Sequence, residues 1–504
     1  MSTQPTDEQR AYWQSHEHFR HTTGVSAGEN WYGIRDLGEQ RLAEVRNRLP
    51  YCGRMDMAWL VMLHKQGLVP TETVRKLLPV LKKSQHEQGW GGEAWLRQQL
   101  QGDEDTASAV NYGRTLQEPM ARMMMRDQLF NTFDELFGCL GIILDVAADN
   151  LDTMMAGHSH WAQAQPTTYA AYLLAVHDGL FRGLEQLELA YRHTNQNSGG
   201  CGACSGTGWP VDRGMITELL GFDKTIELTY DCEASQDEML TIMFAASNMA
   251  VTLSRAALDF NVWVTEEWNL FNVDMTHRDV SSFMPQKANA GNRFEHIRQM
   301  TNRVLGNMQT CLFSFKNEPL QDNLPVYEAD RFVIEGLGHL ETGLWMLRDL
   351  LPHVKPRRER MQELVRGGYS GAPDLAIHLI RKKGYGGRCA HRVCATMVRI
   401  ARERWIAPAA LDGALLDEAA RISGDPEPHL TDAEVQDSMS LDHFFEKHQG
   451  LGDPNPAETE RLIAKRREQL NAAGERLERR KEQVANAYAK LEAELDRITA
   501  SAKE

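Results

Sequence analysis

The segment Ser281-Ser-Phe-Met-Pro-Gln-Lys-Ala-Asn289 places two hydroxyls, a cation and an amide within nine residues. The polar run Asp274–Asp279 before it predicts a loop, and Phe294–Met308 after it predicts a helix. Cationic and amide groups near a helix start suit a carboxylate ligand, because the helix dipole adds to their positive field. The plainer alternative is a serine that caps a helix at the end of a polar loop.

This segment resembles the signature loop of the fumarase/aspartase superfamily, whose pattern is G-S-S-x-M-P-x-K-x-N. Two further blocks in the expected order support the resemblance. Gly157-His-Ser-His160, followed by Ala164-Gln-Pro166, is similar to the family's T-H block with its A-Q-P. Gly113-Arg-Thr-Leu-Gln117 lies where argininosuccinate lyases carry G-R-S-R-N. The resemblance extends over roughly residues 30–465.

The resemblance implies catalytic roles for three residues. Ser281 would be the general base that takes a Cβ proton, and His160 would handle the proton of the departing group. Glu295 would orient His160 or pair with its charge. Because a serine hydroxyl is a very weak base, Ser281 needs help from backbone N–H groups, from Lys287 and from a closed, dry site.

The resemblance also implies a set of substrate-binding residues. Lys287 and Asn289 would hold the carboxylate beside the carbon that loses its proton, where two negative charges develop in the intermediate. Ser159 would replace the family's threonine and keep its hydroxyl. The full expected set is Lys287, Asn289, Ser159, Ser282, Met284, Arg114, Thr115, Gln117 and Asp322.

Departures from the family pattern bear on the substrate. Leu116 stands where relatives have a carboxylate-binding arginine, and Val280 replaces the glycine before the signature serines. Asp322 replaces a tyrosine, which hints at a cationic amine in the leaving group. These changes predict a lyase that releases fumarate and an amine from a succinyl-amine other than argininosuccinate. The alternatives are argininosuccinate lyase proper, a catalytically inactive structural relative and an adenylosuccinate-type lyase.

Composition narrows the possible partners. The chain has 504 residues, a formal net charge of -15 and a sequence pI near 5.7. Because an acidic chain repels phosphates and anionic lipids, nucleic acid and membrane surfaces are not expected partners. The polar start of the chain predicts a cytoplasmic protein. Of eight cysteines only Cys201-Gly-Ala-Cys204 has a metal-like spacing, so neither a metal nor an organic cofactor is expected.

Long stretches of Leu, Ala, Met, Glu and Arg and few alternating Val or Ile runs predict an all-α fold. Three regions are expected: an N-terminal helical domain (1–112), a central helix bundle (113–368) and a C-terminal helical domain (369–504). Within the last, a charged helix from about residue 457 is expected to lie along another surface, with a free coiled coil as the alternative.

The stretch Met239–Phe260 is apolar at almost every position, so it must be surrounded by its own domain or by other subunits. This pattern favours an oligomeric bundle over a monomer. The family resemblance implies a homotetramer in which each site combines the three sequence blocks from three different subunits.

Overall fold

The structure, a computed structural model, describes residues 38–85, 93–115, 119–279, 281–287 and 291–500. Helices dominate these ranges, and the strands within them form three two-stranded sheets. The all-α fold that the sequence predicts is therefore confirmed. In the part of the chain that is described, no helix combines the length and apolar character needed to cross a membrane.

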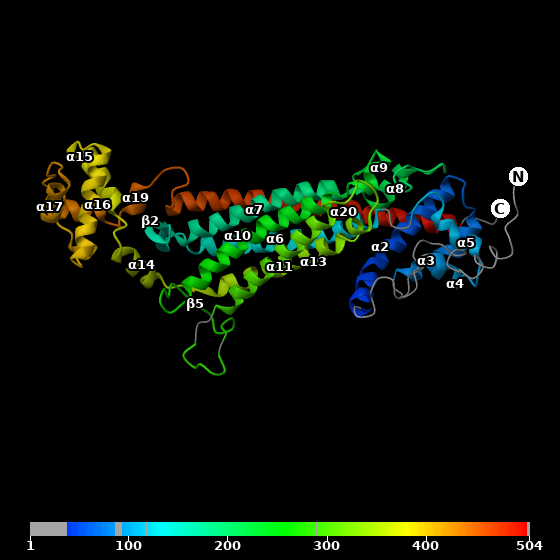
Figure 1. The fold of residues 1–504 in the computed structure, drawn as a ribbon, viewed down its shortest axis with the longest axis horizontal. Helices are drawn as coiled ribbons and strands as arrows, with labels where there is room; N and C mark the ends of the chain where they lie inside the picture. Colours follow the sequence, from blue (N-terminus) through cyan, green and yellow to red (C-terminus); the bar gives the residue numbers. More distant parts are fainter. Residues whose placement is uncertain (1–37, 86–92, 116–118, 280, 288–290, 501–504) are drawn as a thin grey trace.

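Five long helices form an elongated bundle at the centre of the molecule (Figure 1). Leu, Met and Ala are common in them, and these residues favour helices and fill the space between them. The expected apolar stretch Met239–Phe260 lies within one of these helices, and the expected helix Phe294–Met308 lies within another. The five are α6 (Met120–Ala148), α7 (Tyr169–Thr194), α10 (Glu238–Trp263), α11 (Asn292–Phe315) and α13 (Asp330–Leu350). The short α12 (Leu324–Tyr327) lies between α11 and α13 in the chain.

A buried ion pair fixes two of these helices to each other. Arg122 on α6 donates from Nη2 to Oε2 of Glu238 on α10 at 2.8 Å, and both side chains are almost fully buried. Removing one partner of such a pair leaves an uncompensated charge in the interior. The contact therefore specifies how α6 and α10 align.

The N-terminal part of the chain covers one end of the bundle (Figure 1). Its helix at Thr71–Ser84 buries Val74, Leu77, Leu78 and Leu81 on one face. The elements at this end are α2 (Gly38–Lys65), α3 (Thr71–Ser84), α4 (Glu93–Gln99), α5 (Glu104–Ser108), η3 (Ala109–Asn111), β3 (Gln196–Asn197), α8 (Arg213–Leu220), β4 (Lys224–Thr225) and α9 (Thr229–Ala234). Strands β3 and β4 are parallel.

The opposite end of the bundle carries the other two sheets (Figure 1). Strands β1 (Met154–Ser159) and β2 (Ala162–Thr168) form an antiparallel hairpin with an irregular register near Gly157. Thr168 ends this hairpin and caps α7, because its hydroxyl accepts the N–H of Ala171 at 3.1 Å. Strand β5 (Phe271–Val273) pairs with β6 (Val354–Pro356), which follows η4 (Leu351–His353).

Beyond the hairpin lies a smaller group of helices with its own core (Figure 1). Helix α14 packs on β1 and connects this group to the bundle. The members are α14 (Arg358–Gly367), α15 (Ala372–Lys383), α16 (Gly387–Glu403), η5 (Pro408–Ala410), α17 (Gly413–Ser423), α18 (Asp432–Met439) and α19 (Phe444–Lys447).

The last helix, α20 (Pro456–Ala500), runs back along the whole bundle (Figure 1). It buries Leu477 in the core of the bundle and Leu491 in the core of the N-terminal end, so the expectation of a long helix lying along another surface is confirmed. Arg126 of α6 fixes it by donating to the hydroxyl of Tyr488 at 2.6 Å. Helix α20 contributes to the cores of the bundle and of the N-terminal end, away from the other C-terminal helices. The division of the chain into three regions therefore stays a prediction.

Candidate active site

The tip of the β1–β2 hairpin exposes a histidine in an unusual backbone conformation. His160 and Trp161 have φ values of 51° and 63°, so both occupy the left-handed region that a two-residue hairpin turn requires. Neither is a glycine, and each such residue costs about 1 kcal/mol of backbone strain. Strain of this kind gathers at functional sites. Ser159 comes just before this turn and is exposed as well.

The described part of the signature loop centres on the hydroxyl of Ser281. Its Oγ accepts the backbone N–H of Phe283 at 3.2 Å and that of Met284 at 2.9 Å. Donors that point at this oxygen would stabilise negative charge on it, which is what a serine base requires. The expected help from backbone N–H groups is thus present in the geometry of the loop.

The rest of this loop faces outward. Ser282, Met284 and Lys287 are exposed, and the backbone N–H of Lys287 donates to the carbonyl of Met284 at 3.0 Å. The start of the loop is fixed to the bundle, because His277 contacts Asp349 through Nε2 at 3.2 Å and stacks on His353. The loop is therefore open to a substrate, and its start is held against the bundle.

Glu295 lies in the first turn of α11 and is exposed. Within the described residues no hydrogen bond or ion pair connects Glu295, His160 and Ser281 to one another. The β1–β2 hairpin and the signature loop, which comes after β5, nonetheless lie at the same end of the bundle (Figure 1).

The expected residues of the first block lie at the other end of the bundle. Arg114 follows η3 and is buried: its Nε donates to the carbonyl of Val110 at 2.8 Å, and its Nη2 pairs with Asp56. Thr115 is exposed beside it. Asp322 is also exposed at this end, where its backbone approaches Cys204.

Within one chain, the expected site residues therefore form two groups at opposite ends of the bundle. Ser281 follows β5 and His160 connects β1 to β2, at one end of the bundle, while Thr115 follows α5 and η3 and Asp322 lies between α11 and α12, at the other (Figure 1). Four positions that the sequence analysis discussed lie outside the described residues, namely Leu116, Gln117, Val280 and Asn289.

A cavity that sequence reasoning missed adjoins His160. It has a volume of about 350 Å³, and its lining includes His160, Trp161, Trp263, Trp268 and Asp259. In the sequence, the one available signal for this cavity was an acid, Asp259, within the apolar stretch that forms α10. The tryptophans gave no signal, since only the folded hairpin brings Trp161 to the end of that helix.

Asp259 is half-buried in this cavity wall. Burial raises the pKa of its carboxyl, although the hydroxyl of Tyr172, which donates to Oδ2 at 2.9 Å, and the nearby Arg255 oppose the shift. A carboxyl with a perturbed pKa in a cavity is typical of a functional site.

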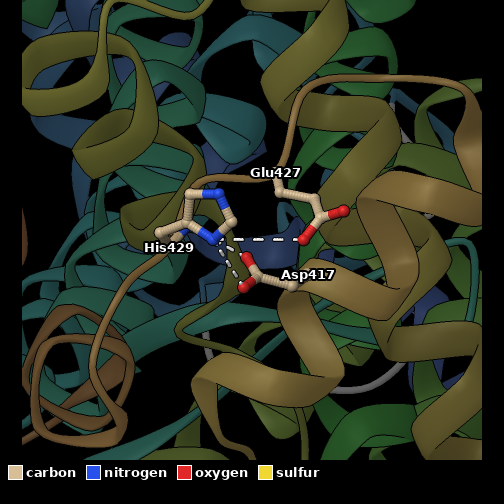
Figure 2. Close-up of side chains that lie close together, drawn as sticks. All are labelled: Asp417, Glu427 and His429. Carbon is tan, nitrogen blue, oxygen red and sulfur yellow. Dashed lines mark hydrogen bonds and ion pairs between the residues drawn. The ribbon is translucent and has the colours of Figure 1, made fainter.

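Among the described residues, one group has the atoms and spacing to hold a metal ion: Asp417 on α17, with Glu427 and His429 in the segment between α17 and α18 (Figure 2). His429 Nδ1 lies 3.0 Å from Asp417 and 3.9 Å from Glu427, and Arg421 pairs with Glu427 at 3.0 Å. These groups already contact one another at the surface. The Cys201–Cys204 pair contributes no such group, since the buried Cys201 thiol donates to Glu233 at 3.0 Å.

Comparisons with known proteins agree with the motif assignment. Residues 81–306 match the protein family described as Lyase. The argininosuccinate lyase of Methanothrix thermoacetophila is 28% identical over 462 residues, which are 89% of this chain and 93% of that protein. The argininosuccinate lyase of Pelotomaculum thermopropionicum is 29% identical over 439 residues, 84% of this chain and 93% of that protein.

Solved structures are similar along most of the chain. EDDS lyase in complex with formate superimposes with a TM-score of 0.83 and 26% identity, covering 90% of this chain and 92% of that one. The class II fumarase of Schistosoma mansoni, at 14% identity and a TM-score of 0.65, covers 79% and 90% and shares the fold. With its signature blocks on this fold, the chain belongs to the fumarase/aspartase superfamily, in its argininosuccinate lyase-like branch, and is an enzyme of the carbon–nitrogen lyase class.

Proposed function

We propose that the enzyme catalyses a reversible β-elimination that splits a succinyl-amine into fumarate and an amine. The observation that carries this proposal is the pair of backbone N–H groups on Ser281 Oγ. They favour the alkoxide that must remove a proton from carbon. A related EDDS lyase has been solved with bound fumarate, which supports fumarate as one product.

Each side chain then has one task. Ser281 takes the Cβ proton, the C–N bond breaks with its electron pair left on nitrogen, and His160 supplies a proton to the departing amine. Lys287 and Asn289 hold the adjacent carboxylate, whose negative charge grows as the proton leaves. Ser159, Ser282 and Thr115 supply hydroxyls to the substrate carboxylates. Glu295 orients His160.

The site is completed by other subunits of a homotetramer. One chain holds Ser281 and Thr115 at opposite ends of its bundle, so it cannot place both on one small substrate (Figure 1). The bundle also leaves apolar side chains exposed along one line of α10, at Phe244, Val251 and Leu258, spaced by seven residues. Such a stripe is the pattern of a helix seam that a second copy covers.

The leaving amine is not arginine in this proposal, because Leu116 replaces the carboxylate-binding arginine of the family. Argininosuccinate lyase proper is the second candidate. The observation in its favour is that the relatives at 28% and 29% identity carry that name.

The deciding experiment runs the reaction in reverse. The purified protein is incubated with fumarate and a panel of amines, and the loss of fumarate absorbance is followed, with the Ser281→Ala variant as control. Consumption of fumarate by wild type alone, with an adduct of matching mass, supports the proposal. Consumption of fumarate with arginine as the only reactive amine, combined with cleavage of argininosuccinate, supports the second candidate.

A further inference from the structure

Two adjoining cavities lie beneath the hairpin that carries His160. The first, of about 350 Å³, contains His160, Trp263 and Asp259 in its walls. The second, of about 310 Å³, contains Glu267. They share Trp268 and other wall residues, so they form neighbouring parts of one hollow. Its size suits a small organic molecule.

The walls of the hollow are aromatic. Trp263 is buried against Tyr172, with ring centroids 4.7 Å apart, and Trp268 packs against His158 at 5.2 Å. Trp161 stands at the rim and is 81% exposed. Indole faces attract organic cations, each with about 0.5–2 kcal/mol depending on how dry the contact is.

The acidic groups of the hollow favour a cation over an anion. Asp259 and Glu267 contribute carboxylates, and Asp259 uses one oxygen to accept from Tyr172 at 2.9 Å. The arginine in the wall, Arg360, is already paired: its Nη1 lies 2.8 Å from Glu363, its Nε donates to the carbonyl of Trp268 at 3.3 Å, and its Nη2 donates to the carbonyl of Glu267 at 3.4 Å. A dicarboxylate would meet like charge here, whereas an ammonium group would meet a partner.

We propose that this hollow is the binding site of the leaving amine, and that the amine is an ammonium carried on an aromatic or similarly apolar group. The inference rests on the proposed elimination and names its substrate class. The apolar group lies between Trp263 and Trp268, and the nitrogen faces Asp259. His160 lines the same space, so a proton can pass between it and the amine nitrogen, while the succinyl part stays with the signature loop.

The test is direct binding to the full-length enzyme, measured by calorimetry. Three probes of similar size each carry one phenyl ring and differ in charge: benzylamine is a cation, benzyl alcohol is neutral and benzoate is an anion. Benzylamine is expected to bind, and the other two to bind about tenfold or more weakly, because only the cation gains the carboxylate and cation–π contacts. Equal affinity for all three probes would overturn the proposal.

Two variants test whether benzylamine binds in the hollow. Asp259→Asn keeps an acceptor for Tyr172, and Trp268→Leu keeps the backbone carbonyl that Arg360 uses, so both should fold; melting curves check this. Each is expected to weaken benzylamine binding about tenfold or more and to raise the KM for amine, with the KM for fumarate unchanged. Glu266→Gln is the matched control, because this exposed acid neighbours Glu267 and is absent from the cavity walls.

The amine site and the elimination can be disproved separately. If amines consume fumarate but Asp259→Asn and Trp268→Leu leave the KM for amine and benzylamine binding unchanged, the hollow is not the amine site and the elimination stands. If benzylamine binds through Asp259 but no amine consumes fumarate, the hollow binds aromatic ammonium ions, but the proposed reaction and the assignment of the hollow to its leaving amine are wrong.

Discussion

Arg114 and Asp56 form an ion pair inside the N-terminal end of the bundle, with both side chains at most 10% exposed. Burial raises the pKa of Asp56, and the guanidinium of Arg114 opposes that shift by stabilising the carboxylate. Arg114 therefore cannot turn toward a substrate without leaving Asp56 charged and unpaired in the interior. The guanidinium of Arg114 is thus held by a buried partner, and its expected role in binding substrate stays a prediction.

Arg114→Gln is accordingly expected to lower the free energy of unfolding by about 3–5 kcal/mol, because it removes one partner of a buried pair. Urea unfolding at constant protein concentration measures this loss. Lys76→Gln is the control, since its ion pair with Asp103 is exposed and screened by solvent, and should contribute little to stability. A stable Arg114→Gln enzyme with a raised KM would instead mean that Arg114 binds substrate.

Ser281→Ala is expected to lower kcat by about a hundredfold or more while leaving the melting temperature unchanged. The general base is lost, but a loop hydroxyl whose hydrogen bonds to the described residues all lie within its own loop contributes little to stability. Steady-state kinetics and thermal melts check both halves. Retention of activity within about tenfold of wild type would remove Ser281 from the role of base.

Some of this site was visible in the sequence and some was not. The loop around Ser281 and the helix after it follow from local pattern, because turn and helix signals act over a few residues. The fate of Arg114 was not visible, since its partner Asp56 is 58 positions away in the chain. The hollow near His160 was hidden for the same reason: Asp259 and Trp161 meet only after the hairpin packs on the end of α10.

The oligomer prediction depends on the exposed stripe of α10. Val251→Glu places a charge in the middle of Phe244, Val251 and Leu258, where burial against another subunit would desolvate it. The variant is expected to shift from tetramer to smaller species by light scattering and to lose activity. The exposed Leu451→Glu is the control. An active wild-type monomer would contradict the prediction.

Sites shared between subunits make a second test possible. Ser281→Ala chains and His160→Asn chains are each expected to be inactive, and tetramers that contain both should recover part of the activity, because some sites then receive one intact residue of each kind. Mixing after mild dissociation, followed by assay, measures the recovery. Hybrids of confirmed composition that stay inactive would indicate that both residues come from one chain.

Asp178 fixes α20 to α7 and makes this contact sensitive to acid. Burial opposes ionisation, but hydrogen bonds from His177 and from Arg466, at 2.6 Å, lower the pKa of Asp178 to about 2. A lowered folded-state pKa gives stability that is present above the unfolded value near 4 and is lost as pH falls toward 2. Asp178→Asn should therefore cost roughly 1–2 kcal/mol at neutral pH, after allowance for solvent screening, and almost nothing near pH 2. Denaturant unfolding at both pH values checks this, and an equal loss at both would contradict it.

The substrate prediction turns on Leu116. The family pattern that this block resembles has an arginine for a substrate carboxylate at this position, and the guanidinium that remains in the block, that of Arg114, is already paired with Asp56. Argininosuccinate would therefore leave one carboxylate short of a partner, which costs roughly 3–5 kcal/mol in a dry site, or a factor of hundreds to thousands in affinity. The purified enzyme is expected to cleave argininosuccinate poorly, and Leu116→Arg is expected to improve that cleavage without harming folding. Product analysis for arginine and fumarate decides the question: efficient release of both by the unmodified chain would show that the carboxylate is held by groups other than an arginine at position 116.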